Sequence, residues 1–101
     1  MRIGIIGGTF DPVHLGHLII AEEARVQLQL AQVIFIPTGQ PWLKASRALT
    51  DGKDRLKMVD LAVASNPYFR VARNEIDRPG PTYTVDTLSE LRNELGPGTE
   101  I

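Results

Sequence analysis

Short, solid apolar runs alternate with stretches of helical periodicity along the 101 residues of the chain. The solid runs cover 3–6, which is apolar apart from one glycine, and 33–36, which is β-branched or aromatic throughout. A weaker run covers 68–72. Runs of this kind are typical of strands that are covered on both faces, as in a parallel sheet.

Three helices are predicted between and after these strands. The first begins near Leu15 or Gly16, the second spans about 51–64, and the third follows Thr84 and ends at the Gly-Pro-Gly of 96–98. Their expected buried stripes are, in chain order, Ile20, Ala21, Ala24 and Leu28; Leu56, Val59 and Val63; and Val85, Leu88, Leu91 and Leu95.

The resulting order of strand and helix, repeated three times, predicts an α/β fold with a doubly wound parallel sheet. Ligands of such sheets bind beyond the carboxyl ends of the strands, so the loops at 7–14, 38–50 and 73–83 are expected to carry the function. Residues 99–101 resemble the approach to a fourth strand. We therefore expect a fragment of a longer polypeptide, truncated after the third helix.

The composition narrows the function classes. With 43% hydrophobic and 23% charged residues, the chain is typical of a globular protein, and its net charge of −1 argues against nucleic-acid binding. It contains no cysteine, no apolar run long enough for a membrane span and no export signal, so we expect a cytoplasmic protein. A local excess of +3 between 44 and 57 fits either a solvated helix face or a site for a small polyanion.

The loop after the first strand is the strongest candidate for chemistry. Gly7 and Gly8 allow a ligand to approach the backbone and expose amide N–H groups to a phosphate. The positive end of the first helix faces the same space. His14 and His17 lie three residues apart, on one side of the first helical turn. A glycine-rich structural turn and two surface or capping histidines are the simpler interpretation, and no carboxylate or cysteine completes a metal site around the pair.

The residues Gly-Gly-Thr-Phe-Asp-Pro-Val-His-Leu-Gly-His at 7–17 resemble the signature of the nucleotidyltransferase superfamily, whose (Thr/His)-x-Gly-His motif binds ATP or CTP. The resemblance implies a Rossmann-like fold and nucleotidyl transfer with Mg²⁺ accompanying ATP. It assigns the catalytic roles to His14 and His17, which stabilise charge on the triphosphate and are not nucleophiles. It implies a phosphate site made of Gly7, Gly8, Thr9, Phe10, His14, His17 and Lys44.

Two further segments, 36–44 and 78–88, resemble the bacterial nicotinate-nucleotide adenylyltransferases, which use ATP and nicotinate mononucleotide. The resemblance places nicotinate mononucleotide on Lys44, Arg55, Tyr83 and Thr84. The amides at the start of the third helix suit the nicotinate carboxylate. Packing is the alternative for Tyr83 and solvation for Arg55, whereas Asp86 and Thr87 are expected to hold the helix start together.

Two features of the chain depart from that resemblance. Relatives often have Pro-Pro-His-Lys where this chain has Pro-Trp-Leu-Lys at 41–44, and they continue into a later segment that helps to hold ATP. Residues 1–101 are therefore expected to be the N-terminal part of a single domain. Pantetheine-phosphate adenylyltransferases, cytidylyltransferases and a non-catalytic nucleotide-binding fragment are the alternatives. The sequence leaves open whether the chain forms a homo-oligomer.

Overall fold

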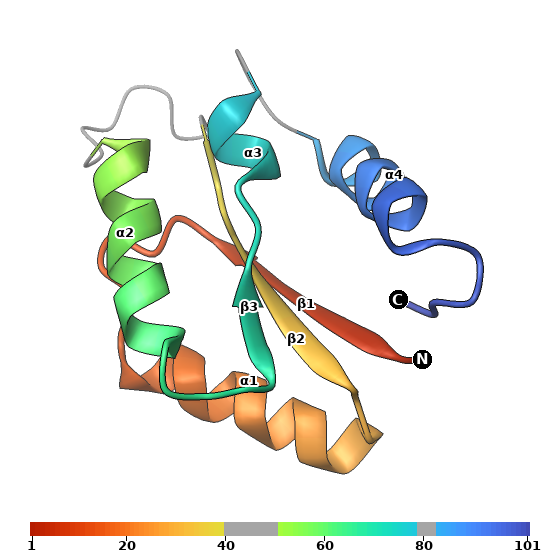
Figure 1. The fold of residues 1–101 in the computed structure, drawn as a ribbon. Coiled ribbons are helices and arrows are strands. Elements are labelled where there is room, and N and C mark those ends of the chain that lie inside the picture. The colour runs from red at the N-terminus through yellow and green to blue at the C-terminus, as the bar shows by residue number, and fades with distance from the viewer. Residues whose placement is uncertain (40–50, 79–82) are drawn as a thin grey trace.

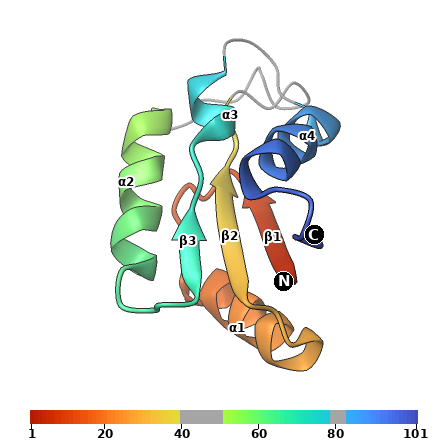
Figure 2. The same ribbon diagram turned by 45° about the vertical axis from the view of Figure 1, so that its right-hand side comes forward.

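The computed structural model describes residues 1–39, 51–78 and 83–101, and in these the chain forms a parallel sheet with helices on both faces (Figures 1 and 2). The strands β1 (Ile3–Gly8), β2 (Gln32–Pro37) and β3 (Phe69–Val71) lie in the order β1-β2-β3. The pairing of β1 with β2 runs from Ile3 beside Gln32 to Gly8 beside Pro37. The predicted α/β sheet and its three strands are confirmed.

In the described part of the chain, four helices connect and cover these strands: α1 (Leu15–Leu28), α2 (Gly52–Val63), α3 (Asn74–Asp77) and α4 (Thr84–Leu95). The bounds of α1, α2 and α4 agree with the predicted helices. Asp51 caps α2 by accepting a hydrogen bond from the Lys53 amide at 3.1 Å, and Gly96, at a φ of 86°, ends α4. The single turn α3 lies within a segment that the sequence predicts to be a loop.

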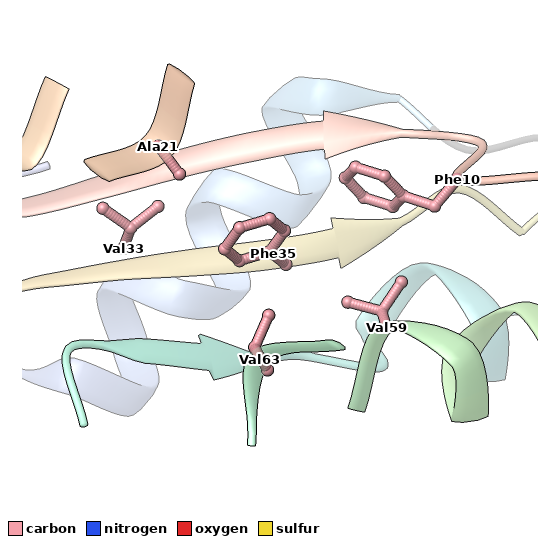
Figure 3. Packing of buried hydrophobic residues seen from close by; sticks show 6 residues of the cluster. All are labelled: Phe10, Ala21, Val33, Phe35, Val59 and Val63. Carbon is pink, nitrogen blue, oxygen red and sulfur yellow. The ribbon is translucent and has the colours of Figure 1, made fainter. Parts of the chain in front are cut away.

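Two apolar clusters pack on opposite faces of the sheet because successive side chains of β2 alternate between them. On the face covered by α1 and α2, the buried residues are Phe10, Ala21, Val33, Phe35, Val59 and Val63 (Figure 3). On the face covered by α4, they are Ile3, Ile34, Ile36, Ala72 and Leu91. The central strand β2 is thus buried from both sides, as its solid apolar run predicts.

The buried faces of two helices differ from the predicted stripes. In α1, Ala21 is buried as predicted, but Ile20 is 64% exposed and Leu18 packs on the core in its place. In α4, Val85 is 68% exposed and Thr87 is buried. The apolar stripe of each helix is wider than the surface that contacts the sheet, so the packing of the helix decides which of its residues are buried. Here each helix is rotated about its axis, and a neighbouring row of residues faces the sheet.

The outer edge of β1 meets the end of the chain. The Ile3 amide donates to the Glu100 carbonyl at 2.8 Å, and the Glu100 amide donates to the Met1 carbonyl at 2.7 Å. These bonds make a parallel bridge between Arg2 and Glu100. The expectation that residues 99–101 approach a fourth strand fits this bridge, which lies on the side of β1 away from β2.

Candidate functional site

The site lies at the carboxyl edge of the sheet. The strand arrowheads point to this edge in Figure 2, where α3 lies beyond the ends of β2 and β3. The loops after β1 and β2 are joined there by a hydrogen bond from the Thr38 amide to the Gly8 carbonyl at 2.8 Å. The sequence predicts ligand-binding loops at this edge, and the structure brings the first two of them into contact.

His14 and His17 form a stacked pair at the start of α1. Their ring centroids lie 3.9 Å apart with an angle of 29° between the ring planes. The Nδ1 atom of His14 accepts a hydrogen bond from the Gly16 amide at 3.1 Å, and the Nδ1 atom of His17 accepts one from the His14 amide at 3.0 Å. The two side chains therefore make a capping box, with histidine in both roles that serine and glutamate usually take.

This capping fixes the tautomer of both rings. A neutral imidazole whose Nδ1 accepts a hydrogen bond carries its proton on Nε2, so each ring of the pair presents an Nε2–H donor. Burial and the neighbouring His14 lower the pKa of His17 below its ordinary value of 6.5. The structure thus favours neutral His17 with its donor on the ring edge away from the helix backbone.

Gly16 is required by the position of the His14 ring. A Cβ atom at Gly16 would lie 2.9 Å from Cε1 and 3.0 Å from Nδ1 of His14, closer than such contacts normally come. A glycine at this position of the sequence could equally leave room for a ligand against the helix. In the structure the room is taken by the His14 ring, which could not cap α1 in this way beside a larger residue.

Phe10 supports the pair from the core. It adopts a φ of 48°, which is uncommon for a residue with a side chain, and its ring is buried between the strands and α1. The ring meets His17 edge-on, with centroids 5.0 Å apart and planes at 83°. Because the Phe10 side chain is buried in this way, only its backbone is left to contact a phosphate, as at Gly7 and Gly8. Its role in phosphate binding stays a prediction.

Arg55, predicted to bind substrate or to be solvated, is 2% exposed. Its guanidinium donates to the carbonyl oxygens of Thr9 at 3.0 Å, Thr38 at 2.5 Å and Gly39 at 3.1 Å. The solvated alternative is therefore wrong. Contact between Arg55 and a substrate stays a prediction, while the structure shows it joined to the backbone of two loops.

Tyr83 and Thr84 mark the start of α4, on the opposite face of the sheet from α1. Both are exposed, and Tyr83 is 54% exposed, so the alternative of a packed tyrosine is wrong. Among the described residues, no side chain caps the start of α4, whereas His14 caps α1 and Asp51 caps α2. Uncapped amide N–H groups at a helix start suit an anion, in line with the predicted site for the nicotinate carboxylate.

A polar network that the sequence only hints at fastens α4 to α3. The buried Thr87 hydroxyl donates to the Glu75 carboxylate at 2.8 Å and accepts a hydrogen bond from Arg78 at 3.2 Å. Arg78 also pairs with Glu90 at 2.5 Å, and Asn74 donates to the same carboxylate group at 3.0 Å. These two hydrogen bonds, from Asn74 first, lower the pKa of Glu90. Thr87 therefore joins α4 to α3, and the expectation that Asp86 and Thr87 hold the helix start together stays a prediction.

Two further predictions concern charge and metal. Lys44, assigned to phosphate and to nicotinate mononucleotide, lies outside the described residues, as do Trp42 and Leu43. In residues 1–39, 51–78 and 83–101, no three histidine, aspartate or glutamate side chains are grouped to hold a metal ion. None of the helices described in those ranges is long and apolar enough to cross a membrane.

Comparison with known proteins gives one family and a consistent set of relatives. The model of the cytidylyltransferase-like family matches residues 5–99. The chain is 61% identical over 94 residues to a protein of Acidothermus cellulolyticus named probable nicotinate-nucleotide adenylyltransferase, covering 93% of this chain and 45% of the relative. Relatives of the same name from Dehalococcoides mccartyi strain BAV1 and Moorella thermoacetica are each 54% identical, over 100% and 99% of this chain and 50% and 46% of theirs. The chain spans about half the length of the curated relatives it matches.

Proposed function

The chain belongs to the cytidylyltransferase-like family, and from that premise we propose that it is the N-terminal part of a single enzyme domain that transfers the adenylyl group of ATP to nicotinate mononucleotide. The products are deamido-NAD and pyrophosphate. The observation that carries the proposal is the stacked pair of His14 and His17, whose Nδ1 atoms are held by backbone amides so that each Nε2 carries a proton.

The chemistry is a displacement at phosphorus. A phosphate oxygen of nicotinate mononucleotide attacks the α-phosphorus of ATP, the bond from that phosphorus to the bridging oxygen breaks, and pyrophosphate leaves with the electron pair. Such a reaction needs positioned substrates and donors aimed at the developing negative charge more than it needs a protein nucleophile. The Nε2–H groups of His14 and His17 supply these donors, and the backbone of Gly7, Gly8 and Thr9 cradles the phosphates.

A divalent cation fits this reaction as a companion of the triphosphate. Mg²⁺ keeps several waters and binds through substrate phosphates more readily than through a full set of protein ligands. The described residues offer no such set. We therefore assign Mg²⁺ to the ATP complex, where it supplies neutralisation of phosphate charge, and we assign no protein ligand to it.

Selection of the acid over the amide follows from the start of α4. The N–H groups at Tyr83 and Thr84 are donors without a side-chain cap, and they match the nicotinate carboxylate. The nicotinamide NH2 would present a donor to these donors. The exposed Tyr83 ring lies at the same helix start and is suited to stacking on the pyridine ring. Lys44 is assigned as a phosphate ligand because the segment 36–44 resembles that of the related enzymes.

Two observations favour alternative functions for this chain. The description of the matched family concerns cytidylyl transfer, which makes CTP an alternative donor. The chain covers only about half of each relative, so a fragment that binds a nucleotide but does not catalyse its transfer is a second alternative. The names of the relatives, at 54 to 61% identity, favour adenylyl transfer to nicotinate mononucleotide over both.

The test is to incubate the full-length gene product with Mg²⁺ and either ATP or CTP, together with nicotinate mononucleotide, nicotinamide mononucleotide, phosphopantetheine or glycerol 3-phosphate. Release of pyrophosphate and formation of deamido-NAD from ATP and nicotinate mononucleotide is the expected result. Equal rates with the acid and the amide, or product only from another acceptor or from CTP, would overturn the assignment. Binding of ATP without turnover on any acceptor would favour the non-catalytic alternative.

A further inference from the structure

Arg55 connects three parts of the carboxyl edge that are distant in sequence. It lies on α2, and its guanidinium reaches the carbonyl of Thr9 in the loop after β1 and the carbonyls of Thr38 and Gly39 in the loop after β2. At 2% exposure it is among the largest fully buried side chains of the described residues. A buried cation is retained in a fold only where polar partners compensate its desolvation, and loop carbonyls provide that compensation here.

The geometry of the guanidinium makes this connection specific. Arginine presents five N–H donors in a planar, rigid fork, so that one side chain can fix several acceptors relative to one another. In this site Nη1 donates to the carbonyl oxygens of Thr9 and Thr38, and Nη2 donates to that of Gly39. A lysine in the same place would keep the charge but not the fork. The relative position of the two loops therefore depends on the shape of the Arg55 side chain and not only on its charge.

The loops that Arg55 holds are those that the proposed reaction uses. Thr9 belongs to the backbone cradle for the phosphates and precedes Phe10, whose ring supports His17. Gly39 packs so closely on α3 that a Cβ atom there would lie 2.0 Å from the Glu75 carbonyl oxygen. The Glu75 carboxylate in turn accepts the hydrogen bond from Thr87 on α4. The contacts thus run from the phosphate loop through Arg55 toward the helix that carries Tyr83 and Thr84.

We propose that Arg55 is a positioning residue, which fixes the phosphate loop at Thr9 against the loop at Thr38 and Gly39 and so sets the geometry for ATP without itself touching a substrate. The inference rests on the proposed adenylyl transfer. The Arg55 guanidinium contacts the phosphate loop at the Thr9 carbonyl, where its charge also raises the electrostatic potential met by a polyanion. The orientation of its donors toward carbonyls separates this role from that of a phosphate ligand.

The experiment compares Arg55→Lys, Arg55→Ala and Gly52→Ala with the wild type in the full-length gene product. Gly52→Ala keeps Arg55 and is a control for local crowding, since its Cβ atom would lie in ordinary contact with Nη2, at 3.4 Å, and closer only to a methyl group of Ile76, at 2.9 Å. Arg25→Met is the control, since Arg25 pairs with Glu22 on α1 and lies over the ring of Tyr68 in the α2–β3 loop, and so contacts neither of the loops that Arg55 joins. Circular dichroism and thermal melting verify that each variant is folded.

Arg55→Lys is expected to lower kcat at least tenfold and to raise the KM for ATP more than the KM for nicotinate mononucleotide, at temperatures well below its melting point. Millimolar guanidinium should restore part of the activity of Arg55→Ala, and Gly52→Ala, which keeps the arginine fork, should leave kcat close to that of the wild type. Arg25→Met is expected to leave kcat and both KM values unchanged. A purely structural role would instead lower the melting temperature of the Arg55 variants and leave their kinetics unaltered.

The outcomes separate this inference from the proposed function. Unchanged kinetics in a folded Arg55→Lys overturns the positioning role while the wild type still makes deamido-NAD. A rise confined to the KM for nicotinate mononucleotide overturns it in favour of direct contact with that substrate. If the wild type makes no product, the proposed function fails, and calorimetric titration with ATP then tests Arg55 alone: unchanged ATP affinity in a folded Arg55→Lys overturns the inference, and weakened affinity supports it.

Discussion

The Nδ1 atom of His17 accepts a hydrogen bond from the backbone amide of His14 at 3.0 Å, so one side chain both closes the start of α1 and directs its Nε2–H outward. The helix cap and the proposed charge-stabilising donor are therefore two ends of the same ring. Structure and activity can be separated at this position, because substitutions can replace one end of the ring without the other.

Replacing His17 by alanine should lower kcat by about a hundredfold, as for the loss of one preorganised donor. Loss of the cap should cost about 1 kcal/mol of folding stability. His17→Asn should recover most of that stability, since its side-chain oxygen lies near the position of Nδ1, but none of the activity. Steady-state kinetics and urea denaturation of the two variants measure the two effects. Parallel recovery of both in the asparagine variant would show that His17 acts only as a cap.

The titration of His17 gives a second prediction. Burial and the neighbouring His14 lower the pKa of His17 in the folded protein, so the unfolded chain takes up the proton first as the pH falls. The stability that this site contributes is therefore present above pH 6.5 and declines as the pH falls below 6.5 toward the folded pKa. An NMR titration should place the His17 midpoint below 6.5. Melting of wild type and His17→Asn across pH 5 to 8 should show a smaller acid-side decline in the variant.

Gly16→Ala should lower the activity while leaving the stability nearly unchanged. Alanine favours a helical backbone over glycine by roughly 0.5–1 kcal/mol, which offsets some of the lost cap. The new Cβ atom, however, would lie 2.9 Å from the His14 ring and push it from its place beside His17. We expect a near-wild-type melting temperature with kcat lowered at least tenfold. A crystal structure of the variant with the His14 ring unmoved would contradict the explanation.

The sequence predicts the framework of this site because its signals are local. Strand ends, the caps at Asp51 and Gly96, and the pairing of two histidines one turn apart all follow from residues within a few positions of one another. The doubly wound arrangement then follows from the alternation of strand and helix.

Other features depend on contacts between residues far apart in the sequence, and the apolar periodicity of single segments does not predict such contacts. Arg55 is buried because it donates to carbonyls 16 to 46 residues away in the sequence. The charged residues around it in the sequence do not predict this burial. The exposure of Ile20 and Val85 arises because a helix with apolar residues on several rows can turn any of them to the sheet. The short helix α3 depends on side-chain bonds to α4, such as that from Asn74 to Glu90.

Thr87→Val tests the network that fastens α4 to α3. Valine keeps the shape of the buried side chain but removes the hydroxyl that joins Glu75 to Arg78, leaving polar groups short of a partner. We expect a loss of about 1–3 kcal/mol in the free energy of unfolding and a reduced preference for nicotinate over nicotinamide mononucleotide. Thr99→Val, which removes a hydroxyl bonded to the Leu95 carbonyl at the far end of α4, is the control. It should cost less and leave the preference unchanged.

Gly39→Ala tests whether the loop after β2 must lie against α3. A Cβ atom at this position would stand 2.0 Å from the carbonyl oxygen of Glu75, and a backbone atom of a packed turn cannot move aside as a flexible side chain can. The loop must shift instead, which strains or breaks the hydrogen bond from Arg55 to Gly39. We expect a loss of roughly 1–3 kcal/mol, as for overpacking, with weaker ATP binding measured by calorimetry. Gly98→Ala, where nothing lies within 4 Å of the added atom, should leave both unchanged, and equal behaviour of the two variants would contradict the close packing.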